Sequence, residues 1–188
     1  MTPDTVLGFW FGTERPRTQR REWFAKDEAF DATISARFGP TIQAALHGDF
    51  DHWQVEPASA LARIVVLDQF TRNTARGSAA AFAGDALALA GAKRMVNQGQ
   101  DLTLDPIERA FVYLPFEHAE TMSAQDESIR LFTRLAEVAP GQAGQLDWAH
   151  KHRAIVERFG RFPHRNAALG RTSTPVELLF LQGPGSSF

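Results

Sequence analysis

The sequence contains no cysteine, a single tyrosine and no long apolar run. Without cysteine, disulfides, thiolate metal sites and thiol nucleophiles are excluded. The most aliphatic run, residues 64–67, and the alanine-rich stretch 79–92 both fall short of the ~20 apolar residues that a transmembrane helix needs. Residues 1–4 lack the basic start and apolar core of a signal peptide. These absences predict a soluble cytoplasmic protein without a membrane partner.

The composition is that of an ordinary globular protein. The chain has 188 residues, of which 44% are hydrophobic and 22% charged, and 15 phenylalanines and 4 tryptophans indicate a core of large rings. The length fits one domain spanning residues 1–188. The Gly- and Ser-rich residues 183–188 fit a flexible tail.

Helical spacing of apolar residues dominates, and no clear alternating strand pattern occurs. The pattern predicts an amphipathic helix over 22–38 that Gly39-Pro40 breaks, and a central helix that begins at Pro57. Capped helix starts are predicted at Asp105-Pro106 and Thr174-Pro175, and Pro115 is expected to kink or end a helix. Further helices are predicted over 78–97, 116–138 and 144–159. Seven to nine helices with short connections make an all-α domain.

Polar residues on the central helix fall on one predicted face. Asp68 lies four residues before Arg72, and that face also carries Gln69, Asn73 and Arg76. The face fits a solvated surface, a buried network that orients the helix end, or a ligand site.

The segment after Pro115 places His118 and Gln125 on an apolar stripe with Met122, while Glu117 and Glu120 lie beside that stripe. A carboxylate next to a partly buried histidine forms an acid/base unit, because each can hold the other in the required protonation state. The alternative is a hydrogen-bonded core histidine. A metal site is not predicted, because the spacing matches neither a two-histidine zinc helix nor a carboxylate-bridged site.

A basic segment follows in the last third of the chain. Between His150 and Arg171 there are six Lys/Arg and one acid, a local charge of 6 − 1 = +5 in a chain whose net charge is −2. Helical spacing turns Trp148 and His152 inward, and a turn-rich stretch then carries Arg161, His164, Arg165, Asn166 and Arg171. Arginines near a turn can hold a phosphate or carboxylate, or pair with acids of neighbouring helices. Nucleic acid is disfavoured, because the chain is acidic overall and has no extended basic stripe.

Several motifs together resemble a bacterial family, domain of unknown function 924. The resemblance covers almost the whole chain and rests on Phe9-Trp-Phe-Gly12, Trp23-Phe24, Phe30-Asp31, Leu67-Asp-Gln-Phe-Thr-Arg-Asn73, Tyr113-Leu-Pro-Phe-Glu-His-Ala-Glu120 and Phe159-Gly-Arg-Phe-Pro-His-Arg-Asn166. Ala119 stands where the family more often has serine. The resemblance implies an all-helical fold related to tetratricopeptide-like arrays, and it assigns no reaction.

Two functions from different classes remain open. In the first, the inward polar faces bind a small anionic ligand, with His118, Glu120 and His164 as candidate acid/base residues. The candidate ligand-binding residues are Arg72, Asn73, Glu117, Gln125, His152, Arg161, Arg165, Asn166 and Arg171. In the second, the chain is a non-enzymatic helical scaffold whose groove binds a peptide or protein. The sequence predicts no particular cofactor or oligomeric state.

Overall fold

The computed structural model describes residues 1–186, and this part of the chain contains helices and no strand. The α-helices are α1 (Pro3–Phe11), α2 (Glu28–His47), α3 (Pro57–Ile64), α4 (Thr71–Thr74), α5 (Asp85–Asn97), α6 (Pro106–Glu117), α7 (Met122–Val138), α8 (Ala143–Phe159) and α9 (Pro175–Leu181). The predicted all-α class and helix number are therefore confirmed.

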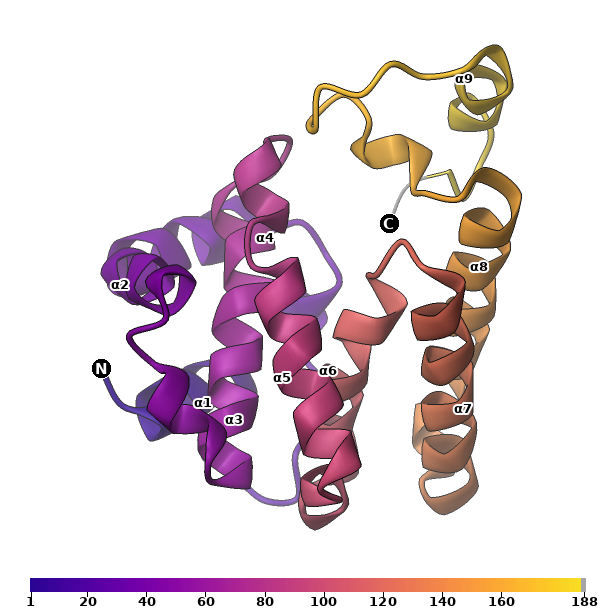
Figure 1. Ribbon diagram of the computed structural model, residues 1–188. Coiled ribbons are helices and arrows are strands. Elements are labelled where there is room, and N and C mark those ends of the chain that lie inside the picture. Colours follow the sequence, from indigo (N-terminus) through magenta and orange to yellow (C-terminus); the bar gives the residue numbers. More distant parts are fainter. Residues whose placement is uncertain (187–188) are drawn as a thin grey trace.

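Helices α1 to α6 form the larger body, and α7 and α8 lie side by side next to α6 (Figure 1). Beyond α8, the segment 160–174 passes over the end of the bundle before α9 begins (Figure 1). Short 3-10 turns join most helices, including η4 (Ala79–Phe82) before α5 and η7 (Pro163–Arg165) after α8. This arrangement brings the ends of α4, α6 and α8 and the start of α5 toward the 160–174 segment.

Large rings fill the core, as the composition predicted. Helix α1 buries Trp10, whose ring centroid lies 5.6 Å from that of Phe70 and 5.7 Å from that of Phe111. Edge-to-face ring pairs of this kind add about 0.5–1.5 kcal/mol each to the free energy of area burial. The core thus ties α1 to the central helix and to α6.

The central helix contains a π-helical segment, η3 (Val65–Phe70), between α3 and α4. All six residues of η3 are buried, including Asp68. Such segments are rare and often mark functional sites. Gly84, just before α5, lies directly against η3, since a Cβ at this position would be 2.1 Å from the carbonyl oxygen of Leu67. Glycine here allows the start of α5 to reach η3.

The predicted proline break in α2 is wrong. Helix α2 runs through Gly39-Pro40 to a left-handed cap at Gly48, and it begins at Glu28 rather than at residue 22. Pro40 removes one backbone hydrogen bond, but Ile34 and Ile42 are buried on either side of it and hold the helix on the core. Helix α6 continues past Pro115 and ends at Glu117, so this proline does not itself end the helix, while a kink there stays a prediction.

The predicted boundaries of two other helices also differ from those in the structure. The helix expected over 78–97 splits at Gly84 into η4 and α5, and the one expected from residue 116 begins at Met122. Trp148 is 45% exposed and not buried. By contrast, the start at Pro57 and the two capping boxes, at Asp105 and Thr174, are confirmed.

At the end of the described chain, Ser186 is buried and its Oγ donates to the carbonyl of Leu181 at 3.2 Å. The flexible tail over residues 183–188 stays a prediction. Residues 187–188, to which the same prediction extended, lie outside the described residues.

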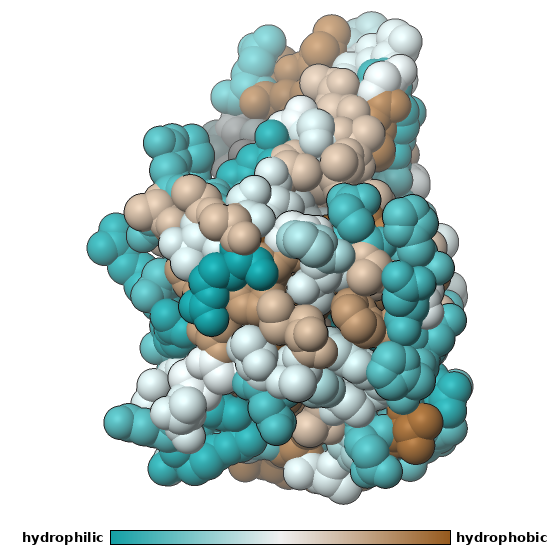
Figure 2. All heavy atoms as spheres, turned by 90° about the vertical axis from the view of Figure 1, so that its left-hand side faces the viewer, coloured by the Kyte–Doolittle hydropathy of each residue, from teal (hydrophilic) through white to brown (hydrophobic). Residues whose placement is uncertain are grey.

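The face that carries α1 and α2 shows small hydrophobic groups separated by hydrophilic side chains (Figure 2). No helix within residues 1–186 is both long and apolar enough to cross a membrane.

Candidate functional site

A histidine and a buried aspartate meet at the end of α6. His118 is the C-terminal cap residue of α6, and its Nδ1 lies 2.8 Å from Oδ1 of Asp68 on η3. Asp68 is 1% exposed, whereas the side chain of His118 is 16% exposed. Gln69 Nε2 donates to the other carboxylate oxygen of Asp68 at 2.6 Å. The aspartate is therefore fixed, and the imidazole reaches from it toward solvent.

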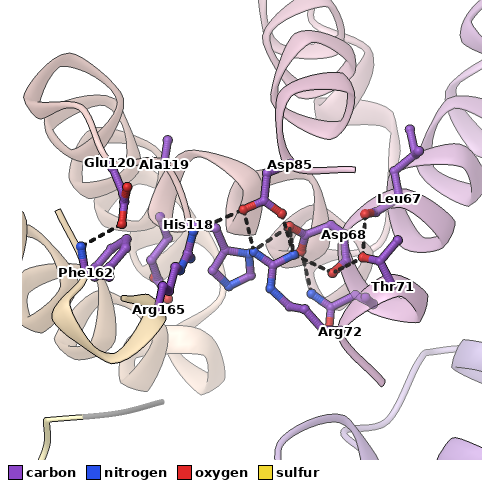
Figure 3. A network of polar contacts seen from close by, with 12 residues as sticks. Leu67, Asp68, Thr71, Arg72, Asp85, His118, Ala119, Glu120, Phe162 and Arg165 are labelled. Atoms are coloured by element: carbon purple, nitrogen blue, oxygen red, sulfur yellow. Dashed lines mark hydrogen bonds and ion pairs between the residues drawn. The ribbon is translucent and has the colours of Figure 1, made fainter. Parts of the chain in front are cut away.

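Two arginines and a second aspartate extend this contact. Arg72 Nη1 lies 3.0 Å from Asp68 Oδ1 and 2.8 Å from Asp85 Oδ1. Arg165 Nη1, from η7, donates to Asp85 Oδ2 at 3.1 Å. Figure 3 shows Asp85 between the two guanidinium groups. We call Asp68, Arg72, Asp85, His118 and Arg165 the His118 cluster; it joins residues from five elements of the fold.

The ionisation states within the cluster follow from its geometry. Burial opposes the charge of Asp68, but the charge of Arg72 and the contact with His118 outweigh burial and hold the pKa of Asp68 well below its usual range. Burial lowers the pKa of His118; Asp68 opposes this effect, and the charge of Arg72 adds to it. Near pH 7 the imidazole is therefore neutral. Because its Nδ1 faces a carboxylate, we assign the ring proton to Nδ1.

That tautomer leaves Nε2 of His118 as an acceptor. Nε2 makes no hydrogen bond to any residue of the described part of the chain. An imidazole whose Nδ1 is held by a buried carboxylate, with Nε2 open, has the arrangement required of a general base.

Arg165 is held between rings. Its guanidinium carbon lies 4.7 Å from the ring centroid of Phe82 and 4.7 Å from that of Phe162. Burial and the charge of Arg72 lower the pKa of Arg165 to about 10, so it remains a cation at pH 7. Its buried Nε has no hydrogen-bond partner within residues 1–186. An unsatisfied buried donor of this kind is costly to the folded state.

Glu117 and His152 form a second buried pair next to His118. Glu117 Oε1 is 3.2 Å from Nδ1 of His152, which also lies 2.9 Å from the carbonyl of Trp148. Burial and the charge of Asp68 raise the pKa of Glu117 to about 8, and burial together with the charge of His118 lowers that of His152 to about 3. Both groups are therefore predominantly neutral at pH 7. The ring centroids of His118 and His152 are 6.3 Å apart.

Glu120 holds the 160–174 segment in place. Its Oε1 accepts from the backbone N–H of Phe162 at 2.7 Å (Figure 3), and its carboxylate receives two bonds from Arg171, at 2.6 and 3.0 Å. Arg171 also donates to the side chain of Asn166 at 2.9 Å. These contacts give Glu120 and Arg171 a positioning role at the edge of the cluster.

His164 lies on the same segment beside Phe162, with ring centroids 5.6 Å apart. Burial and the charge of Arg165 lower the pKa of His164 to about 4. Because His118 and Arg72 also influence this pKa, His164 lies close to the cluster.

Four predicted ligand residues lie elsewhere. Asn73 donates to Asp31 of α2, where Arg76 also pairs. Gln125 is fully buried and donates to the carbonyls of Glu117 and Ala119. Arg161 forms two bonds with Glu177, and Asn166 is buried against the same carboxylate. The structure therefore gives these four side chains structural partners.

The carboxylate that orients His118 is Asp68, and not Glu117 or Glu120 as the sequence suggested. Neighbouring residues of a helix point about 100° apart, so Glu117 points away from the side chain of His118 and contacts His152. Glu120 lies beyond the end of the helix. Asp85 was missed altogether. Its local signal was an aspartate directly after glycine at a helix start inside the alanine-rich stretch.

The described residues form a groove away from the His118 cluster but no candidate metal centre. Within residues 1–186, no group of three or more histidine or carboxylate side chains could hold a metal ion. A groove of about 650 Å³ lies instead between the end of α8 and the start of α9, lined by Arg158, Phe159, Arg161, Thr174, Val176 and Glu177.

Comparisons with known proteins give one family and one similar solved structure. The comparison with curated proteins finds no match. A solved structure of a protein of unknown function from Agrobacterium tumefaciens is 38% identical, with a TM-score of 0.85 over 96% of this chain and 97% of that one. The family model described as "Bacterial protein of unknown function (DUF924)" matches residues 6–185. The chain therefore belongs to this bacterial family, as the motifs predicted, while the relation to tetratricopeptide-like arrays stays a prediction.

Proposed function

We propose that the His118 cluster binds a small anionic ligand, bearing a phosphate or carboxylate group, and that His118 exchanges a proton with it. The observation that carries this proposal is the Asp68–His118 pair, in which a buried carboxylate fixes Nδ1 and leaves Nε2 open beside two arginines. A structural histidine of the core would bury both nitrogens against protein partners.

The arginines supply the affinity for an anion. Arg72 pairs with both Asp68 and Asp85, whereas Arg165 pairs with Asp85 and keeps a donor without a partner in the described chain. A guanidinium recognises carboxylates and phosphates through two parallel N–H groups. The rings of Phe82 and Phe162 hold Arg165 in one orientation, which lowers the entropy lost on binding.

Asp68 and His118 supply the chemistry. The carboxylate stabilises an imidazolium, so Nε2 of His118 can give a proton to a leaving group and take one from a hydroxyl or water. Hydrolysis or group transfer on the bound anion would use this sequence of steps.

A second candidate, a scaffold that binds a peptide or protein, is favoured by a different surface. Helix α9 exposes Val176, Leu178 and Leu179 beside the groove at the end of α8. The ion pairs Arg161–Glu177 and Arg171–Glu120 are satisfied within the chain, as a purely structural framework requires.

A thermal-shift panel of phosphorylated and carboxylated metabolites tests the proposal. A ligand at 100 times its dissociation constant stabilises the folded state by about 2.7 kcal/mol. We expect His118→Gln and Arg165→Gln to lose this stabilisation, and the surface variants His150→Gln and Arg153→Gln to keep it. A ligand that stabilises all four variants as much as the wild type would place its site elsewhere.

A further inference from the structure

The His118 cluster contains no surplus positive charge when His118 is neutral. Its two guanidinium groups, Arg72 and Arg165, are matched by two carboxylates, Asp68 and Asp85, so the charges sum to 2 − 2 = 0. The neighbouring pair of Glu120 and Arg171 adds 1 − 1 = 0. An anion that enters this site therefore leaves it with a net negative charge unless another group gains a positive one.

His118 is placed to gain that charge. Its Nδ1 is engaged with Asp68, so an added proton goes to Nε2, on the side of the ring that the protein leaves open. The resulting imidazolium lies between two negative groups, the Asp68 carboxylate on one nitrogen and the bound anion on the other. Opposite charges on both sides favour the protonated ring.

We propose that anion binding in the His118 cluster is coupled to the uptake of one proton by His118. This inference rests on the proposed function and specifies how that site is regulated: the ligand is held as an anion together with a proton, and binding tightens as the pH falls. No bond other than that of the proton to Nε2 is formed or broken.

The groups around His118 come from every element packed against it: Asp68 from η3, Arg72 from α4, Asp85 from α5, Glu117 from α6, Glu120 from the following turn, His152 from α8, and His164 and Arg165 from η7. Burial keeps His152 and His164 neutral above about pH 5. Glu117 titrates nearest to neutrality, with a pKa of about 8, so it is the main competitor for the proton.

Sulfate is a suitable probe, because its charge stays constant over the tested range. Isothermal titration of the full chain with sulfate, from pH 6 to 8.5 at constant ionic strength, should show a dissociation constant that rises up to tenfold per pH unit above the pKa of His118 in the free protein. At one pH, the measured heat should vary with the ionisation enthalpy of the buffer as expected for the uptake of one proton.

Three variants and one control variant assign the proton. The pH dependence should disappear in His118→Gln and persist in Glu117→Gln and in His164→Gln, while His150→Gln, an exposed histidine of α8, should match the wild type. Sulfate binding that weakens in His118→Gln but shows no pH dependence in the wild type would overturn the coupling and leave the proposed function standing. A pH dependence that survives in His118→Gln would also overturn it. If sulfate does not bind at any pH, both the coupling and the proposed site are wrong.

Discussion

The buried carboxylate of Asp68 gives the sharpest stability prediction. It is 1% exposed and receives contacts from Gln69, His118 and Arg72 at 2.6, 2.8 and 3.0 Å. The substitution Asp68→Asn keeps the shape of the side chain but turns one acceptor oxygen into a donor that faces other donors. It also leaves Arg72 with only Asp85 as a counter-charge.

Removing one partner of a buried ion pair costs about 3–5 kcal/mol. We therefore expect Asp68→Asn to lower the free energy of unfolding by about 3–5 kcal/mol at pH 7, measured by urea denaturation followed by circular dichroism. The exposed Asp49→Asn is the matched control and should stay within about 0.5 kcal/mol of the wild type. His118→Gln, which leaves Arg72 and Gln69 in place, should cost only about 1–2 kcal/mol.

The pH dependence has a defined sign. The pKa of Asp68 is lower in the folded protein than in the unfolded chain, so its stabilisation is present above the unfolded-state pKa of about 3.9 and is lost as the pH falls below that value. Wild type and Asp68→Asn should therefore converge in acid. A loss at pH 7 no larger than that of Asp49→Asn, or a difference that grows as the pH falls below about 4, would be inconsistent with a stabilising buried ion pair at Asp68.

Three further predictions concern separate parts of the fold. The pKa of Glu117 is raised from 4.5 to about 8, so between these pH values the folded state holds a proton that the unfolded chain releases. The free energy of unfolding should therefore fall between pH 5 and 8. Glu117→Gln should remove this fall and raise the free energy of unfolding by about 1–3 kcal/mol at pH 8, measured by urea denaturation. A Glu117→Gln variant with the same pH profile of stability as the wild type would contradict this prediction. Gly84→Ala should cost about 1–3 kcal/mol by the same assay, because its Cβ would meet Leu67, whereas Gly8→Ala in the open interior of α1 should be neutral or stabilising. Equal effects of the two would exclude the close contact. Arg171→Gln should speed proteolytic cleavage within 160–174 severalfold, and an unchanged rate would show that the Glu120 contact does not hold the segment.

The sequence predicted which helices form better than it predicted where they end and how they connect. Capped starts such as Asp105-Pro106 depend on neighbouring residues alone, so they could be identified locally. The continuation of α2 through Pro40 could not, because burial of residues on both sides overrides the local cost of proline. The π-helical segment could not be predicted from the sequence either. Residues 61–67 are apolar or buried on every side of the helix, so the spacing of apolar residues does not change where the π-helix begins.

The residues of the site were predicted in part. Arg72, His118 and Arg165 were selected because each is a polar group within an apolar or turn-rich context, and the fold brings them together. Their connecting acids were assigned incorrectly or missed, because the contacts of Asp68 with His118 and of Asp85 with Arg165 span 50 and 80 residues of sequence. Pairing over such distances is decided by tertiary packing and leaves no local spacing to recognise.

The most direct test of the proposed anion site is a nitrogen-15 NMR titration of the histidine side chains with sulfate at pH 7. We expect His118 in the free protein to be neutral with its proton on Nδ1, and its Nε2 resonance to shift progressively as sulfate is added, while exposed His150 stays unchanged. A His118 resonance that does not respond to sulfate, or that responds no more than His150 does, would contradict an anion site at His118.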